Sequence, residues 1–337
     1  MKIGLVLGGG GLIGMGYHAG ALKALDELGA DPTKADLIVG TSAGAVLGAY
    51  LRSGWTAADF HDYAHGRHPK AEKTEEDQKA QVREIFTPMW ADRPERVRRA
   101  IGGVFAAASS RGIWAKAGGR IPGAVLRHAF PAGLYSTEGT RKRLTDDLPA
   151  RWPKKDVYIC AADLYSGERV AFGHPFAPEA RLPEAVLAST AIPGVFPPVK
   201  IGERQYVDGG VKSATSLDLA VDAGCDAIIC VAPLGYRRDE GLSRTDLKLF
   251  PPMVLRALFA RSLRREVVGA RNKGIDVLVI RPWLTDLKVH GTNSMRHYDR
   301  TKVVEGAREG TLRLLEQHSE HPALKAFQKN RRKERTG

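Results

Sequence analysis

The stretch Gly40-Thr41-Ser42-Ala43-Gly44 follows directly on the apolar run Leu37-Ile38-Val39 and leads into an apolar, helix-forming run at residues 45–51. The pattern G-x-S-x-G between a strand and a helix is typical of a nucleophile elbow, a sharp and strained turn that needs small residues around the serine. The N-terminus of the following helix also favours negative charge on the serine oxygen. A serine that only caps the helix is the alternative. We expect Ser42 to be a nucleophile and Gly40 and Gly44 to shape its turn.

This strand belongs to an alternating order of strands and helices. Residues 3–7 and 36–40 are short apolar runs on either side of a helical pattern at about 18–29, which predicts a βαβ unit. Further apolar runs predict strands at about 156–163, 226–232 and 276–281. Because such strands carry apolar residues on both faces, the sequence predicts an α/β fold whose parallel sheet is covered by helices on both sides.

Length and composition indicate a globular protein. The chain has 337 residues, of which 43% are hydrophobic and 26% are charged, and no linker forces a division into two domains. We expect one domain over residues 1–320, with a helical insertion at about 66–155, where the sequence shows no clear strand. The basic segment 321–337 is predicted to be a flexible tail.

Nothing in the sequence indicates a metal site, a cofactor or a membrane span. The three cysteines lie in apolar runs and are expected to be small core residues, and no cluster of Cys and His at metal-ligand spacing is evident. No apolar run approaches about 18 residues, and the N-terminus lacks the features of a secretory signal. We expect a cytoplasmic protein, or one peripheral to the inner face of the membrane, without metal or cofactor.

The positive charge of the chain is concentrated in a few segments. Lys and Arg number 51 against 38 Asp and Glu, a net charge of +13, which favours anionic partners. Segments 93–127 and 237–273 are both basic and apolar, a composition typical of helices that bind an anionic membrane surface. A solvated helix whose apolar side packs on the core is the alternative. Nucleic acid is not expected as a partner, because there is no zinc-finger spacing and no basic strand studded with aromatic residues.

A second glycine-rich motif, Gly8-Gly9-Gly10-Gly11-Leu12-Ile13-Gly14, follows the first predicted strand. It contains the spacing G-x-G-x-x-G of a dinucleotide-binding loop. Such a fold also needs an acidic residue at the end of the second strand, but Asp31 and Asp36 both precede that strand's end at Gly40-Thr41. Glycine amides between a strand and a helix can equally stabilise an oxyanion. Nucleotide binding and an oxyanion loop are therefore the two hypotheses for this motif.

A serine nucleophile needs a base, and two kinds of candidate are present. In an α/β-hydrolase the base would be a late histidine, and His290, His297 and His318 follow in the right order, with His297 the best of the three. The other candidate is Asp208, in Tyr206-Val207-Asp208-Gly209-Gly210, where a short strand ends in a carboxylate. A hairpin turn is the alternative interpretation of this Asp-Gly pair.

Taken together, these motifs resemble the patatin-like phospholipase family. The resemblance rests on the loop at 8–14, the elbow at 40–44, the segment at 188–198 and the Asp208-Gly209-Gly210 motif, in the family's order. It implies a three-layer α/β/α fold with a mainly parallel central sheet. It also implies a Ser-Asp dyad of Ser42 and Asp208, with Gly9, Gly10 and Gly11 as oxyanion-hole donors and Gly209 and Gly210 as the glycines of the acid motif. One departure is Ile13, where many members carry Arg or Lys.

The resemblance also sets the expected activity. We expect a serine lipid acyl hydrolase of the phospholipase A, lysophospholipase or esterase type, which acts on a lipid or phospholipid ester through an acyl-enzyme. The alternatives are an esterase with a Ser-His-Asp triad, a nucleotide-binding protein that uses the glycine loop, and a membrane-associated protein with little catalytic activity. The sequence does not predict an oligomeric state.

Overall fold

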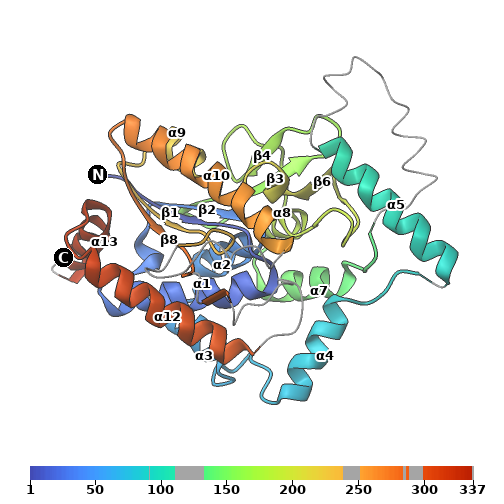
Figure 1. Ribbon diagram of the computed structural model, residues 1–337, viewed down its shortest axis with the longest axis horizontal. Coiled ribbons are helices and arrows are strands. Elements are labelled where there is room, and N and C mark those ends of the chain that lie inside the picture. Colours follow the sequence, from blue (N-terminus) through green and yellow to red (C-terminus); the bar gives the residue numbers. More distant parts are fainter. Residues whose placement is uncertain (91, 111–132, 238–250, 284–285, 288–298, 336–337) are drawn as a thin grey trace. The chain divides into compact units, whose positions relative to one another are not determined.

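The computed structural model describes residues 1–90, 92–110, 133–237, 251–283, 286–287 and 299–335 (Figure 1). The chain divides into two compact units. The first contains residues 1–74, 154–157 and 213–337, and the second contains residues 75–153 and 158–212.

The first unit is built on four parallel strands. They are β1 (Ile3–Leu7), β2 (Leu37–Thr41), β7 (Ala227–Val231) and β8 (Asp276–Ile280), and they lie in the order β2-β1-β7-β8. Every residue of β1, β2 and β7 is buried, as expected for parallel strands covered on both faces. These strands confirm the predicted βαβ unit and the α/β class.

Helices cover both sides of these strands. They are α1 (Gly11–Glu27), α2 (Ala43–Arg52), α3 (Ala57–Ala64), α9 (Asp218–Asp222), α10 (Pro251–Asn272), α12 (Arg300–Gln317) and α13 (Pro322–Arg335). In Figure 1, α9 and α10 lie on one side and α1, α3 and α12 on the other. Helices α1 and α12 approach so closely that a Cβ atom on Gly20 would overlap the carbonyl oxygen of Val304. None of the described helices combines the length and the hydropathy needed to cross a bilayer.

The second unit, as far as the structure describes it, contains antiparallel strands and four helices. Strand β3 (Asp156–Asp163), which begins in the first unit, pairs antiparallel with β4 (Arg169–Phe172) and β6 (Arg204–Asp208), and β6 pairs with β5 (Val199–Ile201). The helices are α4 (Glu75–Ile85), α5 (Arg93–Ser110), α7 (Glu138–Asp147) and α8 (Leu182–Ser189). The protein therefore has an α/β fold with a mixed, mostly parallel central sheet.

The segment after residue 320 differs from the flexible tail that we expected. It forms helix α13, in which Ala323, Leu324 and Phe327 are buried. The Gln328 side-chain amide donates a hydrogen bond of 2.8 Å to the carbonyl of Leu28. These apolar residues form one face of the helix. The expectation of a flexible tail was based on the basic residues of this segment and did not take that face into account.

Candidate active site

Ser42 occupies the turn between β2 and α2 in a conformation that serine rarely adopts. Its φ is 54° and its ψ is −119°, a strained combination for a residue with a Cβ atom and one that tends to occur at functional sites. The Ser42 side chain makes no hydrogen bond to the helix amides that it could cap, so the interpretation of Ser42 as a helix cap is wrong. The residue is only 6% exposed.

The two glycines of the elbow are required by close backbone packing. A Cβ atom on Gly44 would overlap the carbonyl group of Leu7 in β1. A Cβ atom on Gly40 would lie 2.7 Å from the Cα atom of Ala45 and from the carbonyl oxygen of Gly44. The first turn of α2 thus lies directly against the strands, and only glycine fits at these two positions.

The glycine loop leaves the sheet at the same edge as Ser42. In the parallel pair of β1 and β2, Leu7 is paired with Gly40, so the residues that follow both strands emerge side by side. A Cβ atom on Gly9 would lie 3.4 Å from the Cβ atom of Ser42. The structure therefore brings the glycine loop and the serine together, as the sequence predicted.

The backbone amides of the loop are not equivalent, and the assignment of Gly9 as an oxyanion-hole donor needs correction. The Gly9 N–H donates to the carbonyl of Ala214 at 2.7 Å, so it is engaged and cannot serve as an oxyanion donor in this conformation. The N–H groups of Gly10 and Gly11, at the start of α1, have no backbone acceptor among the described residues. The Ala43 N–H at the start of α2 is a further donor of this kind, which the sequence analysis did not identify.

A buried histidine forms a hydrogen bond to the start of the glycine loop. His18 lies in α1, and its Nε2–H donates to the carbonyl of Gly8 at 2.7 Å. Burial lowers the pKa of His18 to about 4, against a smaller opposing effect of this hydrogen bond, so the ring is neutral at pH 7. No sequence pattern singles out His18, because its partner is the loop of its own βαβ unit and the expected place of a base is late in the chain.

Asp208 belongs to the second unit, where it is the last residue of β6. It is 5% exposed, and its Oδ1 accepts a hydrogen bond of 2.7 Å from the Gly210 N–H. The chain continues into a short 3₁₀ helix, Gly209–Val211, so the interpretation of this motif as a hairpin turn is wrong. A Cβ atom on Gly209 would overlap the carbonyl oxygen of Cys160 in β3, which explains the glycine that follows the aspartate.

The late histidines gain no support as a base from the described residues. His290 and His297 lie outside the part of the chain that the structure describes. His318 follows the end of α12, where its Nδ1–H donates to the carbonyl of Leu314 at 2.9 Å. This hydrogen bond caps the helix, which is an ordinary structural role for a histidine at a helix C-terminus.

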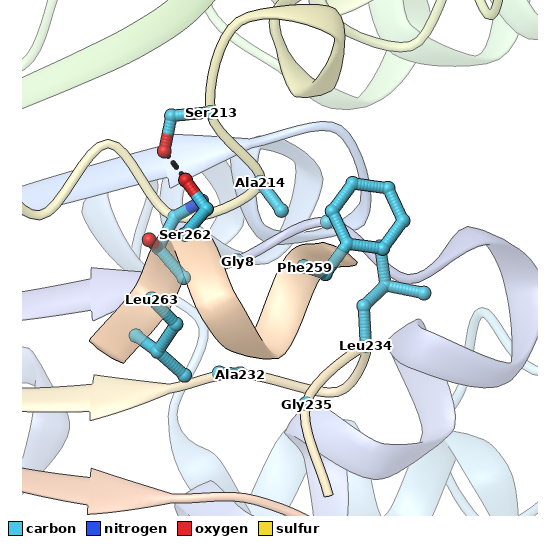
Figure 2. A pocket seen from close by; sticks show the side chains of 11 residues that line it. Gly8, Ser213, Ala214, Ala232, Leu234, Gly235, Phe259, Ser262 and Leu263 are labelled. Atoms are coloured by element: carbon cyan, nitrogen blue, oxygen red, sulfur yellow. Dashed lines mark hydrogen bonds between the residues drawn. The ribbon is translucent and has the colours of Figure 1, made fainter. Parts of the chain in front are cut away.

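A small pocket borders the glycine loop within the first unit. Gly8, Ala214, Leu234, Phe259 and Leu263 are among the residues that line it (Figure 2). Its wall is mainly apolar, and Gly9, which packs against Ser42, is also part of it. The side of the loop that borders this pocket therefore faces mainly apolar surroundings.

Comparison with known proteins gives one family. Residues 5–221 match the patatin-like phospholipase family. Two curated relatives, uncharacterized NTE family proteins of Mycobacterium tuberculosis and Mycobacterium bovis, are each 26% identical over 276 residues, which is 80% of this chain and 36% of the relative. The chain thus spans about a third of the length of these relatives. Among solved structures, VipD from Legionella pneumophila matches with a TM-score of 0.47 and 16% identity over 94% of this chain and 67% of VipD. The type III effector ExoU matches with a TM-score of 0.37 and 17% identity over 94% of this chain and 53% of ExoU.

Proposed function

Because the chain belongs to the patatin-like phospholipase family, which implies lipid acyl hydrolase activity, we propose that it cleaves lipid or phospholipid esters as a phospholipase A, a lysophospholipase or an esterase. The observation that carries this proposal is the strained conformation of Ser42 beside a loop of backbone amides. Strain at a serine whose hydroxyl does not cap its helix is expected of a nucleophile.

In the proposed reaction, the Ser42 hydroxyl attacks the ester carbonyl and Asp208 accepts its proton. The amides of Gly10, Gly11 and Ala43 stabilise the resulting oxyanion. Collapse of the tetrahedral intermediate releases the alcohol, which takes the proton from Asp208, and leaves the acyl group on Ser42. Water then attacks the acyl-enzyme, Asp208 accepts its proton, and the Ser42 oxygen leaves as a restored hydroxyl with the release of the fatty acid.

The oxyanion donors carry much of the catalytic effect in this scheme. A carboxylate with an ordinary pKa of about 3.9 is a weak base towards a serine hydroxyl. Loss of a single oxyanion donor typically costs about 10²- to 10³-fold in rate. Support for Asp208 as the base comes from its burial and from the Gly210 amide that fixes one of its oxygens, since a carboxylate removed from water holds a defined geometry.

Contact with an anionic membrane is a further part of the proposal, and it rests on α5 rather than α10. On α5, Val97 and Ile101 are exposed beside arginines. On α10, Leu263 and Val267 are buried, and Arg256 donates to the carbonyl of Pro233 at 2.9 Å. Helix α10 therefore fits the alternative interpretation, an amphipathic helix packed on the core. Residues 111–127 and 238–250 of the two segments lie outside the described residues.

Labelling with a fluorophosphonate, followed by peptide mapping, tests the nucleophile. We expect label on Ser42 in the wild type and none in Ser42→Ala. Ser53→Ala is a matched control at the opposite end of α2, because the Ser53 hydroxyl donates to the carbonyl of Ala49. Label on any other residue would refute the proposed nucleophile.

Hydrolysis of a short-chain ester tests the base. Asp208→Asn should abolish turnover, whereas Asp163→Asn should retain it. Asp163 is a suitable control because it is also a buried aspartate at a strand end that accepts backbone amides. His297→Ala should also retain turnover, and its inactivity would favour the Ser-His-Asp triad instead.

A further inference from the structure

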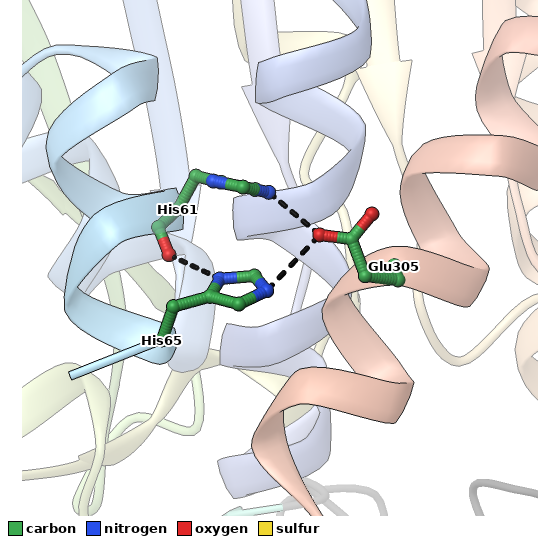
Figure 3. Close-up of side chains that lie close together, drawn as sticks. All are labelled: His61, His65 and Glu305. Carbon is green, nitrogen blue, oxygen red and sulfur yellow. Dashed lines mark hydrogen bonds and ion pairs between the residues drawn. The ribbon is translucent and has the colours of Figure 1, made fainter. Parts of the chain in front are cut away.

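Two histidines and a glutamate from distant parts of the sequence meet on the surface of the first unit (Figure 3). His61 lies on α3, His65 is the residue that caps the C-terminus of α3, and Glu305 lies on α12. Glu305 Oε1 is 2.7 Å from His61 Nε2 and 3.1 Å from His65 Nε2. Both histidine side chains are 14% exposed and that of Glu305 is 32% exposed, so the cluster is sheltered but accessible.

The hydrogen bonds around the rings determine where their protons are. His65 Nδ1 is 2.8 Å from the carbonyl of His61, and a carbonyl can only accept, so Nδ1 carries the proton. The Nε2 atom of His65 then faces Glu305 Oε1 at 3.1 Å. An imidazole nitrogen and a carboxylate oxygen that face each other can both bind one metal ion.

From this arrangement we infer that His61, His65 and Glu305 form a binding site for a zinc ion. Two imidazoles and one carboxylate are a ligand set that Zn²⁺ prefers, with water as the fourth ligand. His61 and the C-cap residue His65 have the i, i+4 spacing that places two side chains on the same side of a helix, and their ring centroids are 4.3 Å apart. The three ligand atoms lie within 4.8 Å of one another, so their separations must shorten or adjust for all three to bind one ion.

Glu305 Oε1 needs only a small movement relative to each histidine to share the ion. A tetrahedral Zn²⁺ bound at about 2.0–2.1 Å separates its ligand atoms by roughly 3.3 Å. The two distances to Glu305 Oε1, 2.7 and 3.1 Å, would therefore widen by roughly 0.2 to 0.6 Å. The hydrogen bond from His65 Nδ1–H to a backbone carbonyl is the outer contact that commonly orients a metal-bound histidine.

His61 must change its hydrogen bonding when the ion binds. Its Nδ1 accepts a hydrogen bond from Arg67 at 3.1 Å, so its proton is on Nε2, the atom that would bind zinc. Zinc displaces that proton, which moves to Nδ1. The hydrogen bond from Arg67 to Nδ1 is then lost, because Nδ1 no longer has a free lone pair. Asp62 Oδ1, 3.8 Å from Nδ1, is then the nearest carboxylate that can accept the new N–H.

The ion would join α3 to α12, and both helices pack on α1. Helix α1 begins at the glycine loop of the candidate active site. The inferred zinc site does not depend on the proposed hydrolase function, because its ligands take no part in that reaction. Its role is to fix the helical layer beneath the loop.

Isothermal titration of the full chain, with any affinity tag removed, tests this inference with ZnCl₂ as the probe. We expect one zinc ion per chain in the wild type. A rise in Tm of about 5 °C is expected at a zinc concentration roughly 100 times the Kd. His65→Gln and Glu305→Gln should each weaken binding by about 100-fold or more, and MgCl₂ should not compete, because Mg²⁺ prefers oxygen ligands.

His68→Gln is the matched control, because His68 is equally sheltered but packs against Trp55 with a ring distance of 4.4 Å. This variant should bind zinc as the wild type does. Co²⁺ loading provides a second readout, since its visible absorption reports nitrogen and oxygen ligands directly. Lack of stoichiometric zinc binding in the wild type, or undiminished binding in both ligand variants, would overturn the inference.

Discussion

Replacement of Gly44 by alanine tests whether α2 lies against β1 as closely as the structure shows. The new Cβ atom would overlap the carbonyl group of Leu7 and would lie 2.7 Å from the Leu7 Cβ atom. Strand β1 cannot retreat, because it is hydrogen-bonded on both sides to β2 and β7. The start of α2 must therefore move away by roughly 1 Å, and Ser42, which adjoins it, must move too.

Two magnitudes follow from this displacement. Overpacking of this kind costs about 1–3 kcal/mol of stability, and the higher helix propensity of alanine offsets up to about 1 kcal/mol of that cost. A misplacement of about 1 Å at a reacting group typically reduces the rate by about 100-fold. We therefore expect Gly44→Ala to remain folded but to lose most of its reactivity.

Urea unfolding and the rate of fluorophosphonate labelling measure the two effects separately. The matched control is Gly269→Ala on α10, because a Cβ atom there meets nothing within 4 Å. That variant should gain up to about 1 kcal/mol and should react at the wild-type rate. If Gly44→Ala unfolds at the wild-type urea concentration and is labelled at the wild-type rate, the close contact between α2 and β1 is not real.

Two further predictions concern buried side chains. Because the pKa of His18 is about 4 in the folded state and about 6.5 in the unfolded chain, the unfolded state binds the additional proton, so stability should fall by up to about 3 kcal/mol as the pH falls from 6.5 to 4. Urea unfolding across this range should show a shallower fall in His18→Gln, and an identical pH profile would contradict the assigned burial. Phe327→Ala should destabilise the protein by about 3–5 kcal/mol, because Phe327 is fully buried in α13. A flexible C-terminal tail would give no change in the same urea assay.

Features confined to a short stretch of sequence were the ones that could be predicted. The strand, the turn at Ser42 and helix α2 are contiguous, and the need for small residues at Gly40 and Gly44 is local. The apolar runs of β1, β2, β7 and β8 likewise identified the parallel strands of the first unit. Burial on both faces leaves a strong signal in such strands.

Features that depend on contacts between distant residues were missed. The Gly9 N–H donates a hydrogen bond to the carbonyl of Ala214, which is more than half of the chain away. No local pattern at residue 9 reveals that partner. His61 and His65 show helical spacing, but their third ligand candidate, Glu305, becomes apparent only when α3 and α12 are packed. Strands β4 and β5 are short and lack an extended apolar run, so pairing rather than composition defines them.

Ile13 stands where many members of the family carry Arg or Lys. This difference can be understood from the position of the proposed oxyanion donors. Helices α1 and α2 begin directly after the neighbouring parallel strands β1 and β2, so both helix N-termini and their unpaired amides lie at one edge of the sheet. Donors of this kind belong to the main chain and are unaffected by the side chain at residue 13. Ile13 itself is only 3% exposed, and an Arg or Lys enclosed there would need a partner to offset the cost of burial. An apolar residue at this position is therefore compatible with the proposed oxyanion hole, in which backbone amides, rather than a cation in the loop, would stabilise the charge.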